Sequence, residues 1–166
     1  MSTKKMTRLA LFTAIALIIF TVESALPALT PIPGIKLGLA NIITLVVLQH
    51  MSTKDALIVL LMRILLATFF FGQALSLLYS LAGGICCLII MHFINLLLGG
   101  KYIYLTSIAG AIAHNIGQLS IAFLITQVEG VLIYLPFLLI SGIVTGLFTG
   151  LCAHFTNQYI KSLFNN

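Results

Sequence analysis

Four polar side chains interrupt the apolar stretches of this sequence, and their chemistry suits a binding site. Arg63, His114, Asn115 and Gln118 lie within hydrophobic runs of a chain that is 61% hydrophobic and only 7% charged. A charge or an amide is costly in hydrocarbon, so such residues usually face a bundle interior, pair with one another, or contact a ligand. Arginine presents a fixed fork of donors to an anion, whereas histidine and the amides both donate and accept.

Four further polar residues extend this candidate ligand site, and they are Glu23, Lys36, Asn41 and Gln73. Among the few acids of the chain, Glu23 is the best partner for Arg63. We expect an outward-facing pocket with Arg63 and His114 as its floor and the loop from Pro27 to Lys36 as its lid. Its apolar shell would come from Phe69, Phe70, Phe71, Tyr79, Phe123 and Tyr134. The alternative is that the arginine and the amides satisfy one another as structural contacts between helices.

Several chemistries are absent from the sequence. The chain has no G-x-x-x-x-G-K-[ST] motif, so it does not contain an ATPase site of that type. Its three acids are too few to hold Mg²⁺ together with a diphosphate. No nucleophile, base and acid stand in a recognisable set. The cysteines lack the spacing of metal ligands. We therefore expect no catalytic activity, no metal site and no cofactor of its own.

The elements that position these residues are expected to be membrane helices. The mean hydropathy is +1.21 over 166 residues, and this length accommodates about six spans. We expect an all-α integral membrane protein, one domain over residues 1–166, with six transmembrane helices. Breaks at proline, glycine and polar clusters place these helices at about 8–26, 37–50, 53–71, 74–98, 105–127 and 131–155.

Three local signals refine these helices. Ser52 followed by Asp55 resembles a capping box and predicts the start of the third helix. Gly142, Gly146 and Gly150 form a row of small residues that predicts a close approach of the sixth helix to a neighbour. Pro136 is expected one turn into that helix, and a polar tail is expected after residue 155.

The charge distribution predicts the orientation in the membrane. With the N-terminus inside, the cytoplasmic side holds Lys4, Lys5, Arg8, Lys54, Lys101 and Lys161, and the outer side holds Lys36. This asymmetry predicts that both termini are cytoplasmic, in a prokaryotic-type cell membrane. The net charge of +5 lies mostly at segment ends, which argues against nucleic acid as a partner and for the lipid bilayer.

Three stretches of the sequence carry a resemblance to a known family. Residues 33–41 (PGIKLGLAN), residues 54–66 and residues 110–118, which include HNIGQ, resemble the Gx transporter family. That family is also named heptaprenyl diphosphate synthase component I. It is similar to the substrate-binding S components of energy-coupling factor (ECF) transporters, whose six-helix bundles bind vitamin-like ligands near the outer face.

The resemblance implies partners for this chain. S components associate with a membrane coupling subunit and a pair of ATPases, so ATP would be used only by those partner subunits. A row of alanines on their first helix faces the coupling subunit, and here that row is Ala10 and Ala14.

Three functions remain open from the sequence. The first is an S-component-like protein that binds a flavin, a quinone precursor or a similar small molecule. The second is a non-catalytic accessory subunit of isoprenoid or menaquinone biosynthesis. The third is a solitary transporter that needs no ATPase.

Overall fold

A computed structural model of the chain describes residues 2–25, 36–72 and 74–164, with side chains through residue 160. The described part is built from helices alone. They are α1 (Thr3–Ala25), α2 (Asn41–His50), α3 (Thr53–Phe71), α4 (Ala74–Leu97), α5 (Ile103–Thr126), a short 3-10 helix η1 (Glu129–Tyr134) and α6 (Leu135–Phe164). The expected lid, except for Lys36, and Gln73 lie outside the described residues.

Four helical segments of the described chain are long and apolar enough to cross a membrane. They are α1, α4, α5 and the segment Glu129–Ile160. The helix α2 is apolar, but its ten residues extend only about 15 Å, half the thickness of a bilayer core. The helix α3 has 19 residues and carries Lys54, Asp55 and Arg63. The six expected helices are therefore present, but four of them, not six, qualify as spans, which fits a membrane-embedded protein.

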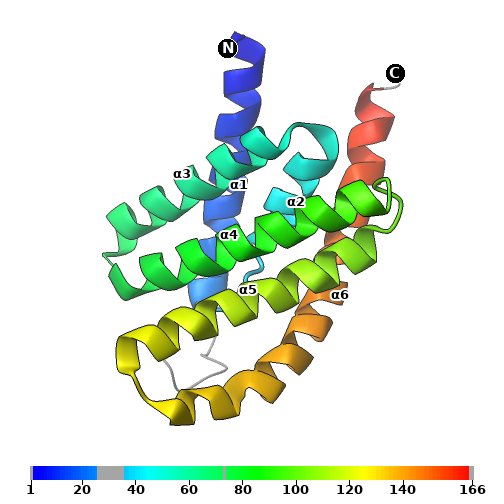
Figure 1. Cartoon of the computed structure of the whole chain (residues 1–166). Helices are drawn as coiled ribbons and strands as arrows, with labels where there is room; N and C mark the ends of the chain where they lie inside the picture. The colour runs from blue at the N-terminus through cyan, green and yellow to red at the C-terminus, as the bar shows by residue number, and fades with distance from the viewer. Residues whose placement is uncertain (1, 26–35, 73, 165–166) are drawn as a thin grey trace.

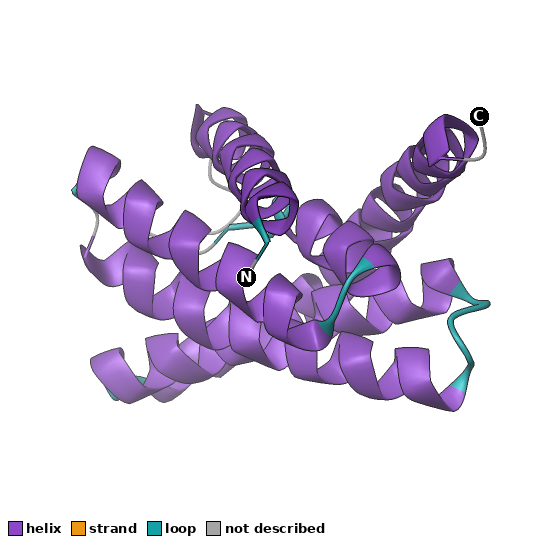
Figure 2. Cartoon of the chain, turned by 90° about the horizontal axis from the view of Figure 1, so that it is seen from above, coloured by secondary structure: helices purple, strands orange, loops and turns teal. Residues whose placement is uncertain are grey.

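The short helix α2 lies at the centre of the bundle. Eight of its ten residues are buried, and it contacts α1, α3, α4 and α6. Around it, α3, α4 and α5 run side by side, while α1 and α6 cross behind them (Figures 1 and 2). A helix that is apolar on every side is stable in such a position because neighbouring helices cover all its faces.

The packing of α6 on α5 depends on its glycine row. A Cβ atom on Gly146 would lie 2.5 Å from the Cα atom of Ile108, which is closer than atoms can approach. Gly142 and Gly150 also face the backbone of α5, near Ile112 and Tyr104. The close approach that the sequence predicts for this row is thus confirmed, and it holds two long helices in backbone contact.

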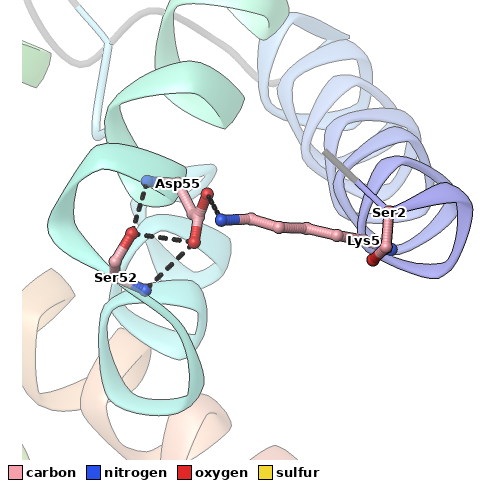
Figure 3. Close-up of polar contacts among 4 residues, drawn as sticks. All are labelled: Ser2, Lys5, Ser52 and Asp55. Atoms are coloured by element: carbon pink, nitrogen blue, oxygen red, sulfur yellow. Dashed lines mark hydrogen bonds and ion pairs between the residues drawn. The ribbon is translucent and has the colours of Figure 1, made fainter.

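The start of α3 is fixed by the predicted capping box. The Ser52 Oγ accepts a hydrogen bond from the Asp55 backbone N–H, and the Asp55 carboxylate accepts one from the Ser52 N–H. The same carboxylate forms a 2.7 Å ion pair with the Lys5 Nζ of α1 (Figure 3). The capping box is confirmed, and the ion pair ties the beginning of α1 to α3.

Some element boundaries differ from those expected. The helix α6 continues to Phe164 rather than ending near residue 155, so the expected polar tail is largely helical. Pro136 is the second residue of α6, after η1, and not one turn inside the helix. A proline is tolerated in the first turn because its missing N–H has no partner there in any case.

Candidate functional site

The candidate site begins where the chain enters α2. Gly38 has a φ of 81°, which glycine adopts without strain. The Glu23 carboxylate of α1 accepts hydrogen bonds from the backbone N–H groups of Gly38, at 2.6 Å, and Leu39, at 3.0 Å. An anion at the beginning of a helix also interacts favourably with the helix dipole. Glu23 thereby fixes the segment that leads into α2.

The ring of His114 lies between two glycines. A Cβ atom on Gly38 would lie 2.8 Å from the His114 Cδ2 and 2.8 Å from the Asn41 Nδ2. A Cβ atom on Gly83 of α4 would lie 2.8 Å from the His114 Nδ1 and 2.9 Å from the Gln118 Cγ. These contacts bring α2, α4 and α5 together around one imidazole, and any larger residue at either glycine would displace it.

Arg63 reaches the same region from α3. Its side chain is 3% exposed and interacts electrostatically with Glu23 and His114. Its Cζ lies 5.7 Å from the centroid of the Phe20 ring. Arg63 and Glu23 do not form a salt bridge within 4.0 Å; the salt bridge found among the described residues joins Lys5 to Asp55. The expected pairing of Arg63 with Glu23 is therefore one of proximity, and the carboxylate bonds to backbone amides instead.

Asn41, Arg63, His114 and Gln118 form what we call the polar core. Each is at most 4% exposed. Nine buried side-chain atoms in the described chain lack a hydrogen-bond partner, and seven of them belong to the polar core. They are the Asn41 Oδ1, the Arg63 Nε and Nη2, both ring nitrogens of His114 and both amide atoms of Gln118. The Gly83 backbone does interact with the His114 ring, but its geometry is too poor for a well-aligned hydrogen bond. A buried polar group without a partner costs about 1–3 kcal/mol of stability. The polar core therefore destabilises the fold unless another group supplies the missing hydrogen bonds.

Lys36 lies beside the polar core. Its Nζ donates a hydrogen bond of 2.6 Å to the Ser24 Oγ and lies 3.7 Å from the centroid of the Phe20 ring. Burial lowers the pKa of Lys36 below its ordinary value; the Glu23 carboxylate opposes that shift, and the Arg63 cation adds to it. Two cations therefore stand near one carboxylate, and that carboxylate already accepts two hydrogen bonds.

Asn115 has a different role from its neighbours in sequence. Its Nδ2 donates to the Leu138 carbonyl at 2.7 Å and to the Ser141 Oγ at 3.3 Å. It therefore connects α5 to α6, on a different side of α5 from His114. The Asn115 Oδ1 remains without a partner, but the contacts of this residue are those of a structural link between two helices.

Three of the aromatic residues expected in the shell are exposed, and of these only Phe71 contacts the Phe20 ring, with 6.2 Å between the ring centroids. The side chains of Phe69 and Phe70 are 82% and 64% exposed, because they follow one another at the end of α3 on faces that no other helix covers. Tyr79 is buried, but it packs with Leu119, Val131 and Leu138. The ring that contacts both cations is Phe20, which the sequence does not single out.

A small cavity borders the site. Its lining includes Phe20, Ser76 and Ser80, and its volume is ≈ 10 Å³. This is about the smallest space that holds one water molecule, which would satisfy the unpaired Ser76 Oγ. Ser76 and Ser80 are buried polar residues of α4 that the sequence analysis missed, because serine is common in membrane helices and gives a weak signal.

The alanine row of α1 lies on a surface. Ala10 and Ala14 are exposed, and so are Leu11, Ile18 and Val22 on neighbouring faces of the helix. This side of α1 is apolar and bears small side chains, so either lipid or another helix could cover it.

A comparison with known families identifies the group to which this sequence belongs. The family model described as heptaprenyl diphosphate synthase component I matches residues 12–156. The chain belongs to the heptaprenyl diphosphate synthase component I family. The match confirms the sequence resemblance to the heptaprenyl diphosphate synthase component I family. No curated protein matches the chain, and no solved structure does.

The family name bears on partners more than on chemistry. "Component I" describes one part of an assembly, so membership in the heptaprenyl diphosphate synthase component I family implies a partner subunit. The matched range, residues 12–156, includes every residue of the polar core. The site is therefore part of the region that the family shares.

Proposed function

We propose that the chain is a membrane-embedded binding protein whose polar core holds a small ligand. One observation carries the proposal: seven buried polar atoms of four residues from three helices meet without protein partners. A fold that needed these residues only as contacts between helices would pair them with one another, as it pairs Asn115 with α6. A ligand that supplied the missing donors and acceptors would recover the cost of their burial.

The charges favour a ligand with an acidic group. Arg63 and Lys36 bring two positive charges, and Glu23 is bonded to the N–H groups of Gly38 and Leu39. An anionic group placed at Arg63 would accept from the Nε and Nη2, which suits the guanidinium fork. His114 and Gln118 would then bind polar atoms deeper in the ligand. A flavin or a quinone precursor with an acidic group has this mixture of properties.

Partner subunits would provide the energy. The ECF-type interpretation assigns ATP hydrolysis to a pair of ATPases and docking to a coupling subunit at Ala10 and Ala14. The exposed, apolar surface of α1 around these alanines supports that docking side. Outward opening of the pocket, closure of the 27–36 loop over it and cytoplasmic termini belong to the same proposal.

The direct test is to identify what the protein carries. The full chain would be extracted both in mild detergent and in native lipid, and its small-molecule content measured by mass spectrometry. We expect the wild-type protein to carry a polar, anionic compound at about one copy per chain. The Arg63→Ala variant should lack this compound. Protein without such a compound after both extractions, or full retention by Arg63→Ala, would contradict the proposal.

A second function is favoured by the family name. In it, the chain is a non-catalytic subunit of a prenyl diphosphate synthase, as the family name suggests, and it would hold a prenyl chain for the catalytic partner. Synthase activity that appears only when this chain is added to its catalytic partner would establish this function. If the activity survives Arg63→Ala, the polar core is not the site that serves it.

A further inference from the structure

A second polar region lies at the opposite end of α2 from Asn41, where the C-terminal half of α6 meets the connection between α4 and α5 (Figure 1). A cavity of ≈ 380 Å³ opens there, within the range of about 300–1,000 Å³ that small-molecule pockets occupy. Its lining is Gln49, Gly100, Lys101, Ile103, His154, Asn157 and Gln158. We call it the α6 cavity.

The hydrogen bonds around the α6 cavity leave donors available. The Asn157 Oδ1 accepts from the His50 Nε2 at 2.8 Å, so the NH₂ group of Asn157 keeps both of its protons for another partner. The Gln158 Nε2 can only donate, so its 3.0 Å contact makes the His154 Nε2 an acceptor. A neutral His154 ring then carries its proton on Nδ1, where it is a further donor.

The charges around the α6 cavity are positive. Among the residues with described side chains, Lys101 lines it and no carboxylate does. The acids of the chain are three in number, and each is placed elsewhere. Glu23 bonds to the start of α2, Asp55 pairs with Lys5, and Glu129 begins η1. An ammonium group and unpaired N–H donors without a neighbouring carboxylate favour an anion.

The surroundings of the α6 cavity are apolar and exposed. Tyr102 and Phe155 adjoin its lining residues in sequence and are 56% and 60% exposed. Tyr104 packs its ring against His154, with 5.6 Å between the ring centroids. A basic, donor-rich hollow next to exposed aromatic residues is an arrangement that suits a phosphate group at a membrane surface.

We infer that the α6 cavity binds a phosphate group, with Lys101, His154 and Asn157 as its ligating residues. The group is either the headgroup of an anionic phospholipid or a phosphate or diphosphate free in solution. This inference goes beyond the proposed function and uses none of the residues of the polar core.

The test is native mass spectrometry of the full chain titrated with defined lipids. We expect one phosphatidylglycerol to bind in preference to diacylglycerol, which has the same tails but no phosphate. Lys101→Gln should weaken the phosphatidylglycerol adduct about fivefold, the contribution of one basic residue at a membrane surface. The matched control is Lys54→Gln, an exposed lysine in the first turn of α3, which should leave the adduct unchanged.

Inorganic diphosphate distinguishes the two sources. If it displaces phosphatidylglycerol from the wild type, the site accepts a free phosphate group; if it does not, the site is specific for the lipid headgroup. Either result supports the inference, provided that Lys101→Gln binds phosphatidylglycerol more weakly than the wild type does. Equal binding of diacylglycerol and phosphatidylglycerol, or an equal loss in Lys54→Gln, would overturn it. Lys101→Glu, which should abolish the preference for phosphatidylglycerol, is the second variant.

Discussion

The contact between α5 and α6 and the polar core use similar residues with opposite results. Between α5 and α6, the Ser107 and Thr149 hydroxyls share a hydrogen bond of 2.6 Å, and the Asn115 Nδ2 bonds to the Leu138 carbonyl. On the other side of α5, His114 and Gln118 are equally buried, but their side chains form no well-aligned hydrogen bond within 3.5 Å, and the backbone of Gly83 is the one polar group described beside the His114 ring. The comparison shows that this fold pairs some of its buried polar groups across helices, and our proposal assigns the unpaired ones to a ligand.

The largest effect is expected at Arg63. Arg63→Ala removes the cation of the polar core, and a hydrogen bond to a charged group contributes about 1.5–3 kcal/mol. The affinity for the co-purifying anionic compound should fall about 10- to 100-fold. Equilibrium binding to purified wild type and variant measures the change. Asn115→Ala, on the α6 side, is the control and should keep its affinity within about twofold.

The next effect is expected at Gly146. Gly146→Ala places a methyl group 2.5 Å from the Ile108 Cα, and overpacking of this kind costs about 1–3 kcal/mol. Chemical denaturation in detergent should show this loss. Gly130→Ala is the matched change, because its new methyl group would meet nothing closer than 3.6 Å. Equal losses in the two variants would show that the close approach of α5 and α6 does not stabilise the fold.

A smaller effect is expected at Asn115. Asn115→Ala removes the hydrogen bonds to Leu138 and Ser141, which should lower the free energy of unfolding by about 1 kcal/mol. The same denaturation measurement detects it. If the variant kept its stability but lost the bound compound, Asn115 would belong to the ligand site. That result would contradict the distinction between the two sides of α5.

The smallest effect is expected at Lys5. The Lys5 side chain is 39% exposed, so solvent screens its ion pair with Asp55. Lys5→Gln should cost roughly 0.5 kcal/mol, and less at high salt. Ser52→Ala, which removes the cap of the same helix, should cost about 1 kcal/mol. Thermal unfolding at low and high salt tests both variants. A larger loss of stability in Lys5→Gln that does not depend on salt would show that solvent does not screen the Lys5–Asp55 ion pair.

The sequence predicts the fold well where a signal is local. The capping box of Ser52 and Asp55 and the glycine row of α6 are confirmed, because short-range spacing determines both. The sequence places the end of α6 too early, because the polar residues after Phe155 resemble a tail although they continue the helix.

The candidate site is only partly predictable. Helical spacing places His114 and Gln118 on one face of α5, and the structure brings both next to Gly83 of α4. The φ of Gly38 and the bonds of Glu23 to the start of α2 depend on tertiary contacts, and no sequence pattern contains them. The same holds for the outward orientation of Phe69, since consecutive aromatic residues cannot all face one pocket.

The most direct test of the central claim is the stability of Gln118→Met in protein freed of small molecules. Gln118 is fully buried with both amide atoms unpaired. If a ligand completes the polar core, an apolar side chain of similar size should leave the empty protein as stable or raise its free energy of unfolding by about 1 kcal/mol. The co-purifying compound should then no longer stabilise it. A loss of about 2 kcal/mol in the empty protein would mean that Gln118 supports the fold, and would contradict the account.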